Sequence, residues 1–381
     1  MQSPKPNIIA RIALASLYLL LLLYNCHRYI LKVNFTGTSP TYSDTPFFWK
    51  ILKYIILIII LAVLYGVTRF RKGIKTKAPI ILLGLLIFFL IVNFFNTIIY
   101  GIVFFDELEY QIYFLLFLPF FFIDTRILDY IQDKLPRLLR ITTWFLVLSQ
   151  MFVVGNYFLY GRLPALAFES TLVRFGGLWD DPNGFGFMCI FLLYLNFIGK
   201  RYFVCLLLLP CAFLTYSLAA FVLLVMGFFY WSGLASLRLR KDMVLMLALF
   251  IVGTIIAVGA YFDRISAFIK LKQRSIGIHS SFDLQFSPIP LLNGPLQFHE
   301  TWLYSFLFNY FPISVFAALL IFYFMVNALI SRNKTVPEFY VYMFLVGSCF
   351  IPFMYDFPLN CFFMMFLALF FYQKERINNP V

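Results

Sequence analysis

Long runs of apolar residues, separated by short polar segments, follow one another along this chain of 381 residues. A membrane-spanning helix needs about 20 mostly apolar residues to cross a hydrocarbon core roughly 30 Å thick. About twelve runs approach that length, the fourth, seventh and eighth being short; their approximate limits are 8–25, 47–68, 79–101, 109–123, 141–160, 183–199, 202–216, 217–234, 243–261, 301–330, 338–355 and 357–372. The pattern predicts an all-α, polytopic membrane protein, a single helical bundle over residues 1–381 with about 12 transmembrane helices.

The positions of the positive charges predict the orientation of that bundle. Short cytoplasmic loops of membrane proteins carry an excess of Lys and Arg. With the N-terminus inside, every second loop is basic: Arg69, Arg71, Lys72, Lys75 and Lys77; Arg126, Lys134, Arg137 and Arg140; Lys200 and Arg201; Arg238, Arg240 and Lys241; Arg332 and Lys334; Lys374 and Arg376. Both termini are therefore predicted to be cytoplasmic. The basic residues that give the chain its net charge of +13 are expected to contact lipid headgroups and not nucleic acid.

Composition excludes an ordinary soluble domain, since 62% of the residues are hydrophobic and only 12% are charged. The predicted outer segments of useful length are 26–46, 161–182 and 262–300. On the inner side, residues 124–140 show apolar residues at helical spacing, which favours an interfacial connector. The cysteines show no CxxC spacing and the three histidines no HxxxH partner, so no metal site is expected.

Ionisable side chains are absent from the centres of the predicted spans where a coupled carrier would need them. The acidic residues outside the inner loops, Glu109 and Asp356 among them, gather at the outer interface, and no acidic residue lies near the centre of a run. Ion-coupled transport generally requires an ionisable group at membrane depth. The polar groups found there are amides, which we interpret as helix-to-helix hydrogen bonders: Asn93, Asn96, Gln150 and Asn196.

A polar, turn-rich segment, Arg174-Phe-Gly-Gly-Leu-Trp-Asp-Asp-Pro-Asn-Gly-Phe-Gly186, lies directly before an apolar run. Gly176 and Gly177 permit close backbone approach, Asp181-Pro182 favours a turn, and Asn183 is able to cap the following helix. This would place Arg174 beside a helix N-terminus, a site attractive to phosphate. The alternative is a simple turn and cap from which the arginine reaches lipid headgroups.

The outer loop 262–300 is unexpectedly basic for its side, with Arg264, Lys270, Lys272 and Arg274. Cations beside lipid fit an anionic, membrane-embedded ligand, and a planar guanidinium pairs well with diphosphate oxygens. The alternative is unspecific contact with lipid phosphates.

These segments resemble conserved-motif regions of the bacterial O-antigen polymerase and O-antigen ligase superfamily. The Arg174–Gly186 segment is similar to that family's Arg-x-x-Gly and Asp-Pro-Asn-x-x-Gly motif. Arg274, Pro290-Leu-Leu-Asn-Gly294, His299-Glu-Thr-Trp-Leu303 and Phe311-Pro-Ile-Ser314 resemble its second block. Two departures stand out: Glu300 replaces a frequent Asn, and Ser217-Leu218 replaces a frequent Ser-Arg pair.

The resemblance implies a membrane glycosyltransferase that polymerises undecaprenyl-diphosphate-linked oligosaccharide at the outer face of the bacterial plasma membrane. A chain-length regulator would be a partner, and neither metal nor cofactor would be needed. Transfer by a ligase to a lipid core, and a polysaccharide-lipid flippase or exporter, remain alternatives. The expected roles are catalysis by His299 or Glu300, diphosphate binding by Arg174, Arg274 and Arg264, and loop support by Gly177, Asp181, Pro182, Asn183 and Gly294.

Overall fold

The computed structural model describes residues 6–26, 47–70, 78–100, 105–160, 168–169, 172–179, 181–232, 313–331, 334–349 and 357–378. These residues form an all-helical bundle, apart from one short ribbon in which β1 (Phe168–Glu169) pairs antiparallel with β2 (Leu172–Val173). The α-helices are α1 (Ile8–Leu23), α3 (Phe47–Val67), α4 (Ala78–Tyr100), α5 (Phe105–Phe117), α6 (Thr125–Tyr160), α7 (Pro182–Ile198), α8 (Tyr202–Phe213), α9 (Leu218–Ser232), α13 (Ile313–Ile330), α14 (Val336–Ser348) and α15 (Leu359–Asn378). Two 3-10 turns, η2 (Leu118–Phe121) and η3 (Gly177–Trp179), complete the described elements.

Each of these helices matches one of the predicted apolar runs, and the run 243–261 lies outside the described residues. The clearest difference is α6, which joins the predicted connector 124–140 and the run 141–160 into one helix of 36 residues. The connector stays helical because Ile127, Leu128 and Ile131 form a buried stripe on it. Pro136 lies inside the helix and removes one backbone hydrogen bond without ending it.

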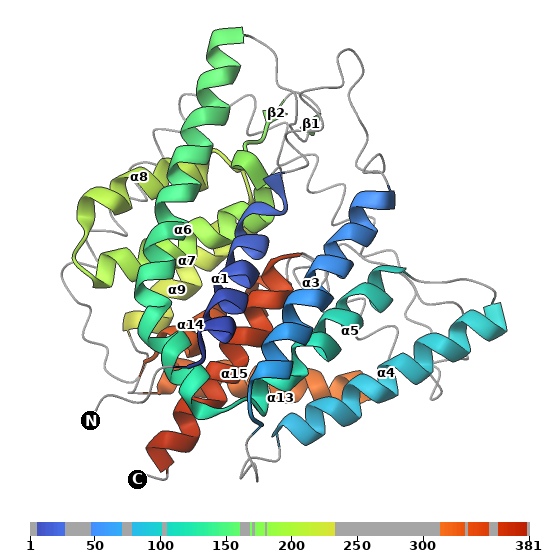
Figure 1. The fold of residues 1–381 in the computed structure, drawn as a ribbon. Coiled ribbons are helices and arrows are strands. Elements are labelled where there is room, and N and C mark those ends of the chain that lie inside the picture. The colour runs from blue at the N-terminus through green and yellow to red at the C-terminus, as the bar shows by residue number, and fades with distance from the viewer. Residues whose placement is uncertain are drawn as a thin grey trace.

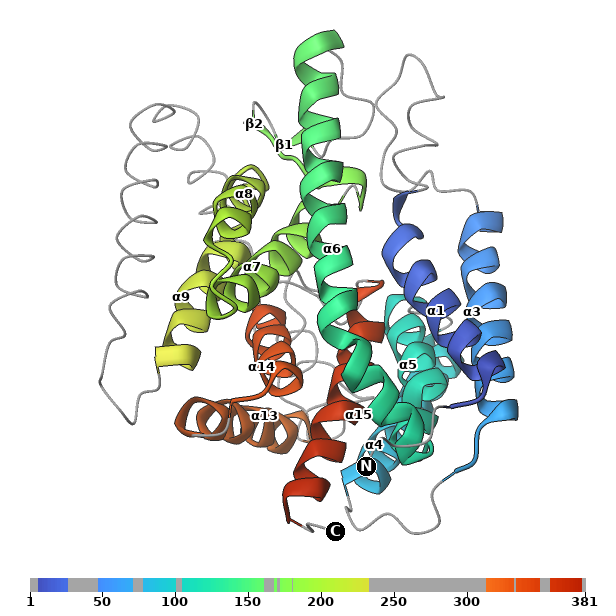
Figure 2. The same cartoon turned by 60° about the vertical axis from the view of Figure 1, so that its left-hand side comes forward.

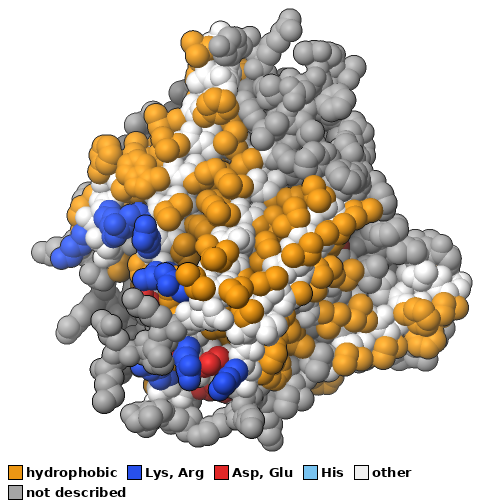
Figure 3. All heavy atoms as spheres, viewed as in Figure 1, with side chains coloured by type: hydrophobic (Ala, Val, Ile, Leu, Met, Phe, Trp, Pro, Cys, Tyr) orange, Lys and Arg blue, Asp and Glu red, His pale blue; other side chains and the backbone are white. Residues whose placement is uncertain are grey.

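Within the described residues, the segment Thr125–Leu159 of α6 is the one helix long and apolar enough to cross a membrane, and shorter apolar helices surround it. Large apolar side chains also cover the outside of the molecule. Ile59 on α3, Phe94 on α4 and Leu148 on α6 are exposed, and Figure 3 shows such side chains over much of one face. Extensive exposed apolar surface is typical of contact with a membrane or another protein.

Helix α7 occupies the interior of the bundle. It is apolar on all sides, with every residue from Gly184 to Tyr194 buried, as expected for a fully enclosed helix. Phe191 packs edge-on against Tyr340 of α14, with ring centroids 4.9 Å apart, and Tyr340 stacks on Phe366 of α15 at 4.3 Å. Figure 2 shows α6 upright between α7–α9 on one side and α1 with α3 on the other. The start of α7 is thereby held firmly at one end of the bundle.

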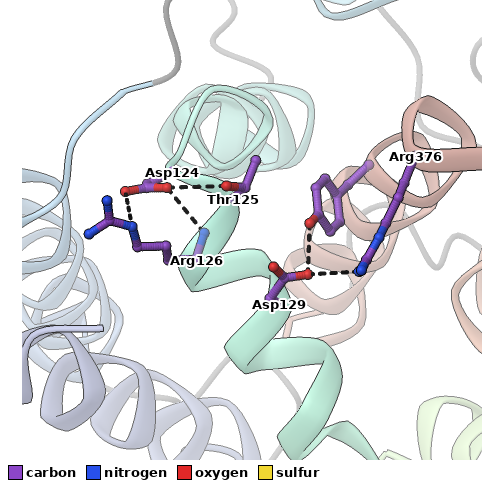
Figure 4. A network of polar contacts seen from close by, with 6 residues as sticks. Asp124, Thr125, Arg126, Asp129 and Arg376 are labelled. Atoms are coloured by element: carbon purple, nitrogen blue, oxygen red, sulfur yellow. Dashed lines mark hydrogen bonds and ion pairs between the residues drawn. The ribbon is translucent and has the colours of Figure 1, made fainter. Parts of the chain in front are cut away.

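Polar contacts join α6 to both α1 and α15 at the opposite end, and Figure 4 shows those between α6 and α15. Asp129 of α6 accepts hydrogen bonds from Tyr372 at 2.7 Å and from Arg376 at 3.2 Å, both on α15. Arg11, in the first turns of α1, donates to Tyr130 at 3.4 Å. The start of α1, the start of α6 and the end of α15 therefore meet at the same end.

An ion pair between a buried lysine and a partly exposed glutamate links α3 to α5. The Lys53 ammonium lies 2.6 Å from a carboxylate oxygen of Glu109, which also accepts a hydrogen bond from Tyr113 at 2.9 Å. Lys53 is only 7% exposed. Its ammonium also lies 5.0–5.8 Å from the centroids of four aromatic rings: Tyr24, Tyr54, Tyr113 and Phe357. The acid assigned by sequence to the outer interface thus has a partner inside the bundle.

Candidate functional site

The segment that leads into α7 forms the predicted turn. The Asp181 carboxylate accepts hydrogen bonds from the backbone N–H of Asn183 at 3.0 Å and of Gly184 at 2.8 Å. Asp181 is therefore the N-cap, and the prediction that Asn183 caps the helix is wrong. The reason is Pro182, which has no N–H and a fixed φ suited to the first helical position, so the cap falls to the residue before it.

The two glycines of this segment permit a close packing that a larger residue would prevent. Gly177 has φ +55°, and a Cβ there would meet the Phe185 ring and come within 2.7 Å of the Ser149 hydroxyl. A Cβ at Gly176 would lie 2.8 Å from the Asp181 backbone. Both the left-handed conformation and the lack of space favour glycine, as the sequence predicts.

Arg174 is buried against the connection between α8 and α9. Its Nε donates to the Thr215 carbonyl oxygen at 2.9 Å, and Nη2 donates to Oδ1 of Asn183 at 2.6 Å. The side chain is only 5% exposed. The backbone is fixed as well, because the Phe175 N–H donates to the Leu214 carbonyl at 3.0 Å.

Two helices begin at this point. Asn183 belongs to the first turn of α7, and the hydroxyl of Ser217, which precedes α9, donates to the same Asn183 oxygen at 3.0 Å. The Ser217 hydroxyl oxygen also accepts from the Ala220 N–H at 3.4 Å, so it caps α9. Helix N-termini carry a partial positive charge. Arg174 therefore adds a full charge where two partial charges of the same sign meet.

Two further side chains hold the segment in place. Gln150 of α6 donates from Nε2 to the Phe175 carbonyl at 3.4 Å, and its buried Oε1 has no partner among the described residues. The Trp179 indole N–H donates to the Leu22 carbonyl at the end of α1, at 2.8 Å. Sequence reasoning interpreted Gln150 as a bond between helices, whereas it binds the backbone of this segment.

The structure brings together five of the residues selected from sequence; these are Arg174, Gly177, Asp181, Pro182 and Asn183. The structure also brings Thr215 and Ser217 to this site. Their residue types gave no indication of such a role, although Ser217 lies at one of the two departures from the family pattern. The remaining candidates lie outside the described residues: Arg264, Arg274, Gly294, His299 and Glu300.

A scan against models of known families, a search of curated proteins and a search of solved structures return no match. A buried guanidinium at two helix N-termini is suited to bind a phosphate group and to stabilise negative charge that develops on it.

Proposed function

We propose that the protein is a multi-pass glycosyltransferase of the bacterial plasma membrane that polymerises undecaprenyl-diphosphate-linked oligosaccharide at the outer face. The observation that carries the proposal is the buried Arg174 guanidinium at the joint N-termini of α7 and α9. This arrangement fits the diphosphate of a lipid-linked donor, and its motif resembles that of the O-antigen polymerase and ligase superfamily.

Two features of the fold support a membrane location. Apolar side chains cover exposed faces of α3, α4 and α6. Contacts of the predicted inner segments, such as Asp129 with Arg376, lie at one end, and contacts of the predicted outer segments, such as Trp179 with the end of α1, lie at the other. This separation is what a bundle of alternating spans requires, and the positive-inside pattern then orients the Arg174 end outward.

In the proposed reaction, the donor diphosphate is bound by Arg174 and by Arg274, with Arg264 as a further candidate. An acceptor sugar hydroxyl attacks the anomeric carbon of the donor, and the bond from that carbon to the diphosphate oxygen breaks. The electron pair leaves with the diphosphate, whose charge the arginines stabilise, while His299 takes the hydroxyl proton. Glu300 is the alternative base. The lipid diphosphate is itself the activated leaving group, so the proposal requires neither nucleotide nor metal.

A reconstituted assay tests this proposal directly. Purified protein in detergent receives only lipid-diphosphate-linked oligosaccharide, with a metal chelator present, and the products are separated by glycan length. We expect longer glycans and release of undecaprenyl diphosphate. No extension by folded protein would refute the polymerase. Extension only after addition of a lipid core acceptor would indicate a ligase, and movement across liposomes without extension a flippase.

Asn183→Asp tests the role of the Arg174 charge separately from folding. The new carboxylate keeps the shape of Asn183 and the oxygen that accepts from Arg174, but it adds a negative charge 2.6 Å from that guanidinium. An acid in the first turn of α7 also suits the helix dipole. We expect an unchanged thermal midpoint and a loss of transfer of about tenfold or more. Asn7→Asp, which adds the same charge at the N-cap of α1, is the matched control. Full activity of Asn183→Asp would show that Arg174 has only a structural role.

Arg174→Lys complements that variant, because lysine keeps the charge and loses the paired geometry of the guanidinium. We expect transfer to fall strongly. Arg137→Lys, on the exposed first part of α6, is the control and should transfer normally.

A further inference from the structure

A second cationic site lies between α6, α7 and α8. A cavity of about 280 Å³ opens there, lined by Arg140, Thr143, Trp144, Asn196, Arg201 and Val204. This is far more than the ~10–15 Å³ that a cavity needs to hold one water molecule, and it is enough room for a phosphate group and its first substituents.

The two arginines are the groups of this cavity that remain available to a ligand. Neither guanidinium forms a hydrogen bond or an ion pair with any residue that the structure describes. The polar groups behind them are already engaged, since Asn196 donates to Thr143 at 3.3 Å and to the Leu192 carbonyl at 2.9 Å. The lining of the cavity is mainly apolar, and two positive charges at its edge suit an anionic group that carries an apolar part.

The turn between α7 and α8 places Arg201 at this cavity. Lys200 adopts φ +57°, and the Arg201 N–H donates to the Asn196 carbonyl at 2.9 Å, so the chain reverses within two residues. Arg201 directly precedes α8, and Val204 of the first turn of α8 also lines the cavity. The positive end of that helix dipole adds to the two arginine charges.

This site is distinct from the one around Arg174. Asn196 and Asn183 lie on the same helix, thirteen positions apart, which corresponds to about 20 Å along α7. In the proposed orientation the Arg140 cavity is at the cytoplasmic side, while Arg174 is at the outer side.

We propose that the cavity between Arg140 and Arg201 binds the phosphate-bearing headgroup of an anionic membrane lipid. The apolar surroundings favour a lipid over a soluble phosphate ester. Trp144, on the cavity wall, is 41% exposed, and Leu148 of α6 and Phe203 of α8 continue the exposed apolar surface beside it. Acyl chains have a place to lie along that surface once the two arginines hold the headgroup. The inference rests on the proposed membrane location and does not depend on glycosyl transfer.

The test measures lipid binding alone, without donor or turnover. Purified protein in neutral detergent is titrated with short-chain phosphatidylglycerol, and bound lipid is counted by native mass spectrometry. We expect saturable binding that weakens by about tenfold or more in the Arg140→Gln, Arg201→Gln double variant. Arg137→Gln, one turn from Arg140 on α6 and outside the cavity, removes the same charge and should bind as wild type.

Competing ligands identify the source of the phosphate. Inorganic phosphate that displaces the lipid at similar concentration would overturn the lipid assignment, and equal binding of phosphatidylcholine would overturn the requirement for net negative charge. A double variant that binds as tightly as wild type would refute the site itself. Equal thermal midpoints for the variants and the wild type serve as the folding control. Failure of the transferase assay would leave these binding results unaffected.

Discussion

Replacing Glu109 by Gln would remove a carboxylate that lies 2.6 Å from the buried Lys53 ammonium. The substitution keeps the size of the side chain and an oxygen that accepts from Tyr113, so the charge is the main change. Lys53 is enclosed by aromatic rings that cannot replace a carboxylate at 2.6 Å. The perturbation therefore isolates the ion pair between α3 and α5.

The expected loss in the free energy of unfolding follows from the burial of Lys53. Removing one partner of a fully buried pair typically destabilises a protein by about 3–5 kcal/mol. The Glu109 side chain is 28% exposed, so this range is the upper limit here. At about 2.1 cal/mol/K per residue, the 381 residues give an unfolding entropy of about 0.8 kcal/mol/K. The midpoint of thermal unfolding should therefore fall by up to about 6 °C.

The cysteines of the protein supply the assay. All six are free, and five of them are buried, so a thiol-reactive fluorescent dye reports their exposure on heating. Asp133→Asn is the matched control, since Asp133 and Lys134 also pair, at 2.7 Å, but with both side chains well exposed. An exposed pair contributes about 0–1 kcal/mol, which corresponds to at most about 1 °C here.

A second variant separates the buried charge from the shape of the site. Lys53→Met combined with Glu109→Gln removes both charges and should recover most of the lost stability, because a buried ion pair is often matched by uncharged residues of similar volume. If Glu109→Gln unfolds at the wild-type temperature, or if the double variant is the less stable of the two, the argument for a buried, mutually dependent pair is wrong.

The remaining predictions concern residues assigned to the proposed reaction and the turn before α7. His299→Ala should abolish polymer formation in cells while the protein remains in the membrane, and His279→Ala, in the same outer loop, should not; polymer of wild-type length would remove His299 as the base and leave Glu300 as the next candidate. Arg274→Lys should reduce transfer strongly in the reconstituted assay because the paired guanidinium geometry is lost. Full activity of this variant would show that only a positive charge is needed at position 274. Gly177→Ala should lower the thermal midpoint and the activity together, since φ is positive and Ser149 leaves no space, whereas Gly155→Ala, with nothing within 4 Å, should change neither.

The sequence predicts the helices well, because each helix contains a continuous apolar run whose length can be read directly from the residues. Its main error, at α6, arises from treating charged residues as the end of a span. Arg126, Lys134 and Arg137 interrupt the apolar run, yet a helix needs only a stripe such as Ile127 and Ile131 to continue.

The site is predictable only where it is local. The turn at Asp181-Pro182 and the glycines follow from neighbouring residues, whereas Thr215, one of the partners of Arg174, is 41 positions away. This contact depends on where the connection between α8 and α9 lies in the fold, which the residue types do not indicate. Lys53 escaped notice for the same reason, since its partner Glu109 is 56 positions away.

The continuity of α6 has a mechanical consequence. At 36 residues the helix is about 54 Å long, well beyond a hydrocarbon core of roughly 30 Å. It carries Asp129, Arg140 and Gln150 in turn, so one rod connects the polar network, the cationic cavity and the backbone of the Arg174 segment. The one interior proline, Pro136, lies between the first of these and the other two, and a helix bends most easily at such a residue. Arg140 and Gln150 lie on the same side of Pro136, so a bend at the proline would move the cavity wall and the Gln150 amide together.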